Sequence, residues 1–270
     1  MRIAIIGGGN MGATYARAFV RSNILKKEDL LIIEKHEEKR EELKKEELCT
    51  LSDSVPDNLS TYSIIILAVK PQDFKKLVPE LKAHISKSHI IISIMAGIKI
   101  NSIEQSLGHN NVVRAMPNTP AQLGFGITAF TVNTTSTDMG LVSIADTLFE
   151  TTGKAVFMKD EELLDAVTAL SGSGPAYFFY FVKNMIEAGK EMGMEEHIAA
   201  MLVKQTMLGA FQIMNNSKYS LDQLIQSVAS KGGTTEAALK QFEEHSIGNN
   251  IKVAVKAAEQ RAKELSRESA

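Results

Sequence analysis

The fold is decided by residues 3–12, which read Ile3-Ala4-Ile5-Ile6-Gly7-Gly8-Gly9-Asn10-Met11-Gly12. The first four predict a short buried strand, and Gly7, Gly9 and Gly12 have the G-x-G-x-x-G spacing of dinucleotide-binding loops. In such a loop the first glycine makes a tight turn, the second lets the backbone approach a pyrophosphate, and the third lets the next helix pack closely. The phosphates then lie at a helix N-terminus, where free N–H groups favour anions. We expect residues 7–12 to bind a dinucleotide; a merely structural turn is the alternative.

The composition is typical of a soluble globular protein. The chain has 270 residues, of which 44% are hydrophobic and 23% charged. Its 30 basic and 32 acidic side chains give a net charge of -2, so nothing favours nucleic acid or an anionic membrane as a partner. The single cysteine, Cys49, excludes an intramolecular disulfide and fits a reducing compartment.

No targeting or membrane-spanning segment is expected. The longest apolar runs, residues 64–69 and 90–98, are far shorter than the roughly 20 residues that cross a bilayer. Residues 1–6 are too few for the core of a signal peptide. We therefore expect a cytoplasmic protein.

Short apolar runs alternate with helical periodicity through the first part of the chain. Continuous apolar strands of this kind predict a parallel sheet covered by helices on both faces. We expect an α/β Rossmann domain over residues 1–158, with a helix near 137–149 and Pro79 interrupting the helix that follows the third strand. After the first strand, the expected strands are 30–33, 64–69, 90–94, 112–115, 126–132 and 155–158.

The pattern changes near residue 160, and only helical periodicity follows. We expect an all-helical dimerisation and substrate domain over residues 159–270, with helices near 160–170, 175–193, 195–214, 220–229, 234–244 and 247–267. The helix 175–193 is apolar on more than one face, which argues for burial on all sides. A domain this small can hardly surround it, so an obligate homodimer is expected.

An acidic residue ends the second predicted strand. Glu34 lies roughly 20 positions beyond the glycine loop, where a carboxylate holds the ribose hydroxyls of the adenosine half. A carboxylate there repels a 2′-phosphate and favours NADH. Lys35, His36 and Lys39 lie close enough in sequence to attract that phosphate instead. Either NADPH or NADH is therefore expected to serve as the cofactor, with a preference for NADH.

Ligands of an open α/β sheet bind beyond the carboxyl ends of its strands. Ala68-Val69-Lys70-Pro71, Ala96-Gly97 and Met116-Pro117-Asn118-Thr119-Pro120 all fall at that edge. The prolines make the last loop rigid and present Asn118 as a hydrogen-bonding group, which suits a nicotinamide pocket. The alternatives are that residues 116–120 are only a stiff connection and that Lys70 is an ordinary surface lysine. The residues predicted to contact the cofactor here are Ala68, Val69, Lys70, Pro71, Met116, Pro117 and Asn118.

Two loops of the helical half combine glycine with hydroxyl groups before a helix. They are Ser171-Gly172-Ser173-Gly174-Pro175 and Ser230-Lys231-Gly232-Gly233-Thr234-Thr235. Open N–H groups at a helix N-terminus suit a carboxylate, although both loops could be plain helix caps. The six histidines are scattered without the spacing of a metal site, and no nucleophilic serine context is evident. The pattern fits a hydride transfer without metal or covalent catalysis.

At this point the chain resembles the Δ1-pyrroline-5-carboxylate reductase family over essentially its whole length. The matching motifs are Gly7 to Gly12, residues 68–71, Arg114 to Pro120, Asp165 to Tyr177 and Gly232-Gly233-Thr234-Thr235, the last being the most specific. The resemblance implies reduction of (S)-1-pyrroline-5-carboxylate to L-proline by NADPH or NADH. It also implies a helical dimerisation domain, dimers sometimes assembled into rings, and an active site shared between subunits.

The resemblance also carries residue roles onto this chain. The threonine that hydrogen-bonds the imine nitrogen falls on Thr235, and the substrate carboxylate meets Ser230, Gly233 and Thr234. Ser171 is predicted as a further substrate contact. The chain departs from the family pattern where Lys231 replaces a proline, where Lys183-Asn184 replace Glu-Ala, and in the turn Glu34-Lys35-His36.

Two alternatives to this reductase remain at the level of sequence. A β-hydroxyacid-type dehydrogenase shares the plan and needs a lysine on the long helix, which Lys183 could supply. A nucleotide-binding regulator that has lost turnover is the other, although the intact loop at residues 232–235 argues against it.

Overall fold

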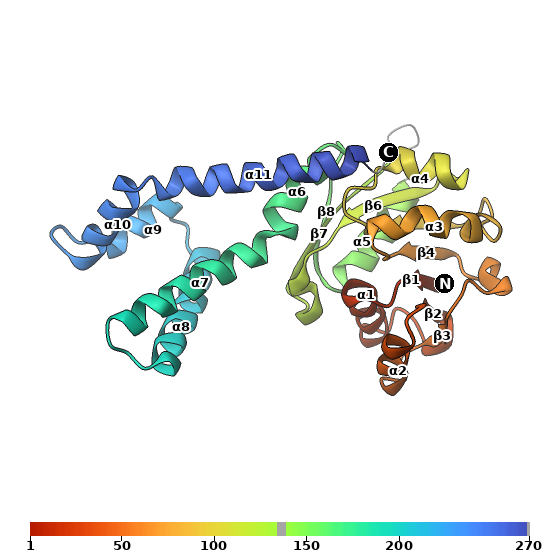
Figure 1. Ribbon diagram of the computed structural model, residues 1–270, viewed down its shortest axis with the longest axis horizontal. Coiled ribbons are helices and arrows are strands. Elements are labelled where there is room, and N and C mark those ends of the chain that lie inside the picture. The colour runs from red at the N-terminus through yellow and green to blue at the C-terminus, as the bar shows by residue number, and fades with distance from the viewer. Residues whose placement is uncertain (134–138, 269–270) are drawn as a thin grey trace. The chain divides into compact units, whose positions relative to one another are not determined.

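The computed structural model describes residues 1–133 and 139–268, and its elements are labelled in Figure 1. The chain forms two compact units. The first comprises Met1–Ser173 together with Ala258–Ala270, and the second comprises Gly174–Ala257. The predicted domain boundary between residues 158 and 159 stays a prediction.

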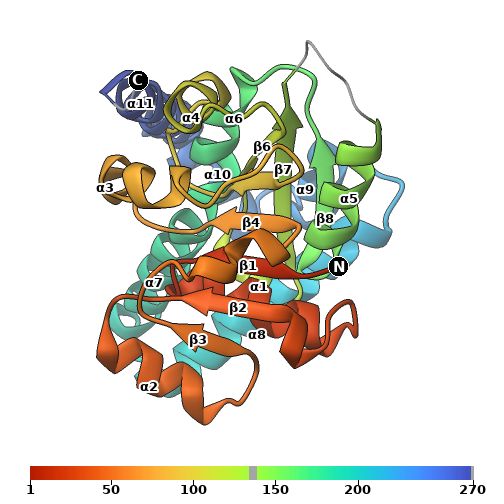
Figure 2. The same ribbon diagram turned by 90° about the vertical axis from the view of Figure 1, so that its right-hand side faces the viewer.

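The first unit is built on one eight-stranded sheet in the order β3-β2-β1-β4-β5-β6-β7-β8 (Figure 2). Most strands are the short apolar runs that the sequence predicts, since isoleucine and valine suit a sheet buried on both faces. The strands are β1 (Ile3–Ile6), β2 (Leu30–Ile33), β3 (Thr50–Ser52), β4 (Ile64–Leu67), β5 (Ile90–Ser93), β6 (Val112–Met116), β7 (Gly126–Val132) and β8 (Gly153–Phe157).

Two strands correct the prediction of a parallel sheet. Strand β7 pairs antiparallel with β6, and β8 runs parallel to β7, so both oppose the other six strands. The reason is the short link between β6 and β7, which holds only the 3-10 turn η3 (Thr119–Leu123). A parallel return needs a crossover of a dozen or more residues, and the link offers fewer. Strand β3 was not predicted, because it is only three residues long and none of them is fully buried.

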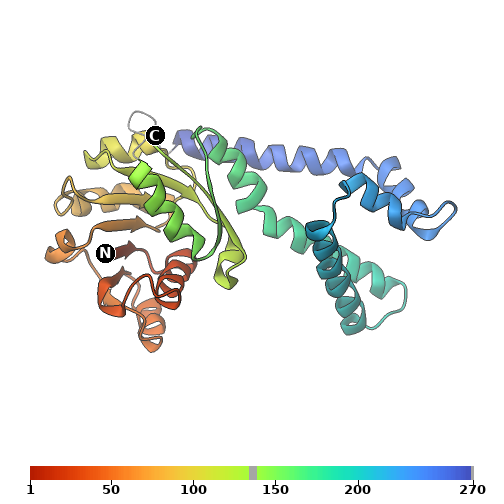
Figure 3. The same cartoon turned by 180° about the vertical axis from the view of Figure 1, so that it is seen from behind.

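Helices cover both faces of the sheet, as the sequence predicts. Ile3 and Ile5 of β1 belong to one core cluster, and Ala4 and Ile6 belong to the other, because successive strand residues point to opposite faces. The first cluster includes residues of α1 (Asn10–Arg21), α2 (Glu37–Lys45) and α5 (Met139–Glu150), of which α1 and α5 are seen in front of the sheet in Figure 3. The second cluster includes residues of α3 (Pro71–Lys82) and α4 (Ile100–Leu107).

Helix α3 corrects another expectation, because it continues through Pro79. A proline inside a helix removes one N–H and costs about 3 kcal/mol. Phe74 and Leu81 lie on either side of Pro79 and are buried in the second core cluster, which offsets that cost. Helix α5 corresponds to the helix expected near 137–149, although residues 137 and 138 lie outside the described part of the chain.

The second unit is helical, as predicted, and no strand occurs among the described residues after β8. After α6 (Leu163–Val167) in the first unit, the helices are α7 (Gly174–Glu191), α8 (Glu196–Asn216), α9 (Leu221–Val228), α10 (Thr234–Glu244) and α11 (Ile247–Glu268), of which α11 continues into the first unit. Helices α7 and α8 pack closely at Gly189, where an added Cβ would lie 2.8 Å from the Cβ of Ala199. A capping box between Ser220 and Gln223 starts α9.

Helix α7 is not buried on all sides within this single chain, as expected of a helix that a domain this small can hardly surround. Only Gly174 and Gly189 of this helix are fully buried. Phe178, Phe179 and Tyr180 expose 61%, 69% and 70% of their surface. A helix with this much uncovered aromatic surface needs a partner beyond its own chain. Among the described helices, none combines the length and the hydrophobicity required to span a bilayer.

Candidate active site

The glycine loop joins β1 to α1 with the geometry that its spacing predicts. Gly7 has a φ of +109°, and a β-carbon there would lie 2.6 Å from the carbonyl oxygen of Ala68. A β-carbon on Gly12 would strike the carbonyl oxygen of Gly7, so α1 can approach β1 only with glycine there. Gly9 caps α1 without a side-chain hydrogen bond, and no atom lies within 4 Å of where its β-carbon would be. The N-terminus of α1 is therefore open to a pyrophosphate.

The carboxylate of Glu34 closes this loop from the neighbouring strand. Glu34 is only 5% exposed, and its Oε2 accepts the backbone N–H of Gly8 at 2.9 Å. Its Oε1 accepts the N–H of His36, also at 2.9 Å. Arg40 donates to the backbone carbonyl of Glu34 at 2.8 Å. The acidic residue that the sequence assigns to a ribose is thus also an internal tie between β2 and the glycine loop.

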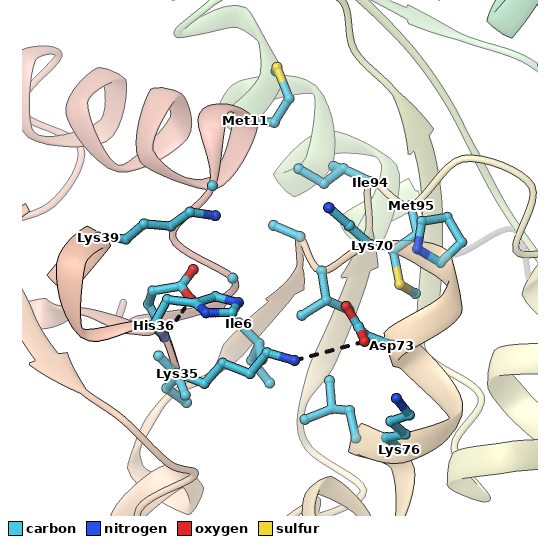
Figure 4. A pocket seen from close by; sticks show the side chains of 18 of the residues that line it. Ile6, Met11, Lys35, His36, Lys39, Lys70, Asp73, Lys76, Ile94 and Met95 are labelled. Atoms are coloured by element: carbon cyan, nitrogen blue, oxygen red, sulfur yellow. Dashed lines mark hydrogen bonds and ion pairs between the residues drawn. The ribbon is translucent and has the colours of Figure 1, made fainter.

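A cavity of about 610 Å³ lies along the carboxyl ends of β1, β2, β4 and β5 (Figure 4). In the close-up, Lys35, His36 and Lys39 reach into it from one side, and Lys70 and Lys76 reach into it from the other. Lys35 also lies 3.8 Å from the carboxylate of Asp73. Most of the predicted cofactor residues meet here: Gly7, Gly9, Asn10, Met11, Glu34, Lys35, Ala68, Val69, Lys70 and Pro71.

Five predicted cofactor residues do not line this cavity. Gly8 and Gly12 shape the loop from beneath, through the bond to Glu34 and the contact with Gly7. The others lie one strand beyond the cavity: Met116 ends β6, and Pro117 and Asn118 follow it. The side chain of Asn118 accepts the backbone N–H of Ile127 at 3.0 Å, which fixes the link into β7.

Several lining residues were missed by the sequence analysis. Asp53, Ser54 and Val55 follow β3, and recognising that strand would have placed them at the edge. Helix α3 contributes the second group, whose members recur every three or four positions as one helix face does: Asp73, Lys76, Leu77 and Glu80. That periodicity was the available signal, but it does not say which face meets the cavity.

Ser171 belongs to the first unit, in a turn that contacts the end of β6. It belongs to a π-helical turn, η5 (Thr168–Gly172), a type of turn that is frequent at functional sites. A β-carbon on Gly172 would lie 2.5 Å from Cε of Met116, so this turn packs directly on the Met116 side chain. The hydroxyl oxygen of Ser171 is buried and has no hydrogen-bond partner among the described residues. Residues 116 and 172, which are distant in the sequence, are therefore neighbours.

A buried ion cluster holds this region to the sheet. Arg114 of β6 donates to Glu161 at 3.1 Å and to Asp165 at 3.0 Å. Asp165 also accepts the hydroxyl of Ser266 at 3.0 Å. The side chains of Arg114 and Asp165 are 3% and 2% exposed, which makes this an ion pair shielded from water. It joins β6, α6 and the last turns of α11.

The remaining predicted residues form one turn in the second unit. Helix α10 begins at Thr234 with Gly233 as its N-cap residue, and no side chain caps it. The N–H of Gly233 donates to the carbonyl of Ser230 at 2.9 Å. Ser230, Gly233, Thr234 and the half-buried Thr235 are thus gathered at one helix N-terminus. In residues 1–133 and 139–268, no three His, Cys, Asp or Glu side chains cluster so as to hold a metal ion.

Comparison with known proteins decides the family. Residues 161–265 match the family model described as pyrroline-5-carboxylate reductase dimerisation, and residues 2–97 match the model for NADP oxidoreductase, coenzyme F420-dependent. A pyrroline-5-carboxylate reductase of Pseudomonas aeruginosa is 36% identical over 98% of this chain and 96% of its own length. The chain belongs to the pyrroline-5-carboxylate reductase family.

Solved structures of this family agree with that assignment. A pyrroline-5-carboxylate reductase from Coxiella burnetii is 32% identical, covers 98% of each chain and has a TM-score of 0.86. Plasmodium falciparum pyrroline carboxylate reductase, solved with NADP bound, is 28% identical with the same coverage and TM-score. The β-hydroxyacid-type dehydrogenase and the regulator without turnover are not favoured by these likenesses. Lys183, the residue on which the dehydrogenase depended, is exposed on α7.

Proposed function

We propose that this enzyme reduces (S)-1-pyrroline-5-carboxylate to L-proline with NADPH or NADH, the last step of proline biosynthesis. The observation that carries the proposal is the full-length likeness to named reductases, 36% over 98% of the chain. The direct test is to follow oxidation of NADH and NADPH with and without pyrroline-5-carboxylate. Oxidation that does not depend on this imine would refute the proposal.

The first unit fits the dinucleotide. The open N-terminus of α1 and the free space above Gly9 suit a pyrophosphate, and the carboxylate of Glu34 lies where ribose hydroxyls would meet it. Lys70 and Met95 line the same cavity. The bound nucleotide supplies the hydride. The protein's part is to hold the reacting ring at this edge of the sheet and to keep the pyrophosphate on α1.

The second unit supplies the groups for the substrate. Ser230, Gly233 and Thr234 surround the first turn of α10, where unbonded backbone N–H groups favour a carboxylate. The Thr235 hydroxyl would hydrogen-bond the imine nitrogen and orient the ring: it would accept the N–H of a protonated imine or donate to a neutral one. As the hydride reaches the adjacent carbon, the nitrogen keeps the proton of the protonated imine or takes one from water. Ser171, whose buried hydroxyl has no hydrogen-bond partner in the described part of the chain, is the candidate for a further polar contact.

The proposal includes a homodimer in the cytoplasm. A dimerisation model matches residues 161–265, and the aromatic side chains of α7 stand exposed in the single chain. Assembly of dimers into a ring stays a prediction from the resemblance. The cytoplasmic location is supported by the single, partly buried cysteine, since the resulting lack of an intramolecular disulfide suits a reducing compartment.

A further inference from the structure

The loop before α10 is a type II turn over residues 230–233. Gly233 donates its N–H to the carbonyl of Ser230 at 2.9 Å, which closes the turn. Gly232, at the third position, has a φ of +73°, and Lys231, at the second position, does not have a positive φ. This combination defines type II, in which glycine is required at the third position and proline is favoured at the second. Lys231 therefore occupies the position that a proline would stiffen.

Glu236 holds this turn from inside the helix. It is the third residue of α10, the position from which an acidic side chain usually reaches back to the N-cap N–H. That N–H belongs to Gly233 and is already bonded to Ser230. The carboxylate instead reaches one residue further, and its Oε2 accepts the N–H of Gly232 at 2.7 Å. Glu236 thus fixes the one residue of the turn that has left-handed backbone.

The loop needs this hydrogen bond, because its own residues allow many backbone conformations. Glycine populates many backbone conformations, and the loop contains two of them in succession after a lysine. The groups assigned to the substrate lie on both sides of Gly232, so their relative positions depend on its conformation. Glu236 also leaves the N–H groups of Thr234 and Thr235 unclaimed, since its carboxylate is turned toward Gly232.

We propose that Glu236 is a positioning residue for the reductase reaction. It acts through Gly232 to keep Ser230 and Thr234 in the relative positions that the substrate carboxylate requires. The inference rests on the proposed function. It assigns no contact between Glu236 and the substrate. Its effect is expected on the Michaelis constant for the imine rather than on cofactor binding, because the dinucleotide residues belong to the other unit.

The test compares three variants in steady-state kinetics of the full chain. Glu236→Ala should raise KM for pyrroline-5-carboxylate on the order of 10-fold, with a smaller change in kcat, because misplacing a positioning group weakens binding. Glu236→Gln should stay near wild type, since its amide oxygen can still accept the Gly232 N–H. Glu243→Ala, which removes another exposed carboxylate of α10, is the matched control and should change neither constant.

Rescue separates positioning from general damage. Adding Lys231→Pro to Glu236→Ala should bring KM most of the way back to the wild-type value, because proline fixes the second position of a type II turn. The proposal is overturned if Glu236→Ala leaves KM unchanged, if it weakens NADH binding equally, or if the proline restores nothing. A wild-type enzyme that fails to reduce the imine would instead overturn the proposed function. The two failures are therefore distinguishable.

Discussion

The side chain of Glu34 is bonded to the backbone of Gly8, with 2.9 Å between Oε2 and the amide nitrogen. The bond crosses from the end of β2 to the loop that follows β1, and a second one to the N–H of His36 uses the other oxygen. The charge that we expect to select the cofactor therefore also holds the loop that we expect to bind it. Substituting this residue should affect both properties.

Glu34→Gln should weaken NADH binding about 10-fold. Glutamine offers one acceptor oxygen where Glu34 offers two, so one buried N–H loses its partner at a cost of about 1–3 kcal/mol. The variant should also shift preference toward NADPH, because the charge that repels a 2′-phosphate is gone. Fluorescence titration with both nucleotides measures this, and Glu37→Gln on exposed α2 serves as the control. A wild type that binds NADPH far more tightly than NADH would contradict the expected preference.

Thr235→Ala should lower kcat by on the order of 10²-fold, because it removes one preorganised hydrogen-bonding group at the reacting nitrogen. Affinity for the nucleotide should stay nearly unchanged, since the glycine loop lies in the other unit. Thr235→Ser keeps the hydroxyl and should recover much of the rate. Single-turnover kinetics and nucleotide titration check this together. An alanine variant with wild-type kcat would remove Thr235 from the mechanism and turn attention to Ser171.

Phe179→Asp should convert the protein to an inactive monomer. Phe179 is 69% exposed on α7 in the single chain, where we expect the partner subunit to cover it. A charge placed in that apolar interface would be strongly unfavourable. Size-exclusion chromatography with light scattering gives the mass, and Lys75→Asp, at an exposed position of α3, is the control. The wild type should remain a dimer at micromolar concentration. A stable, active wild-type monomer under those conditions would disprove the predicted obligate dimer.

Asp165→Ala should destabilise the protein by about 3–5 kcal/mol, because it leaves the buried Arg114 guanidinium without its closest carboxylate. The comparison is Glu162→Ala, which breaks the exposed pair with Lys99 and should cost less than about 1 kcal/mol. Urea unfolding at one fixed protein concentration measures both, since dimer stability depends on concentration. Equal losses for the two variants would contradict the contrast in burial.

The free energy of unfolding should fall as the pH drops below 6.5, the ordinary pKa of a histidine side chain. Burial, together with the charge of nearby His109, lowers the pKa of His89 in the folded state. Its Nδ1 accepts the N–H of Ser86 at 2.8 Å and cannot do so when protonated. The unfolded chain then binds the proton more readily, so acid favours unfolding. His89→Gln should flatten the dependence of urea midpoint on pH between 5 and 7, roughly the window around an ordinary histidine pKa; the exposed His197→Gln should not.

Much of the fold could be predicted, because most strands are rich in isoleucine and the first loop is rich in glycine. The direction of β7 could not be predicted from its residues, since the same apolar pattern suits a parallel and an antiparallel strand. Only the short link after Met116 carried the information. Strand β3 has too few buried residues to show a pattern. Helix α3 passes through Pro79 because tertiary burial of Phe74 outweighs a local preference.

The candidate site was predicted best where residues directly follow a strand. Gly7, Glu34 and Lys70 meet at one cavity because the carboxyl ends of neighbouring parallel strands share an edge. The face of α3 that carries Lys76 depends on how that helix crosses the sheet, which the sequence does not state. The bond between Glu236 and Gly232 was also beyond prediction, because the usual partner of such a carboxylate is the N-cap N–H.

The cluster around Arg114 has a consequence for how the protein is made. Ser266 completes that cluster, so the nucleotide-binding unit includes residues separated by the whole helical unit in the chain. On the ribosome, domains usually fold in the order of their synthesis. Here residues 258–268 emerge only after residues 174–257, and until then Asp165 lacks one of its partners. The first unit to be synthesised is therefore the last to be completed.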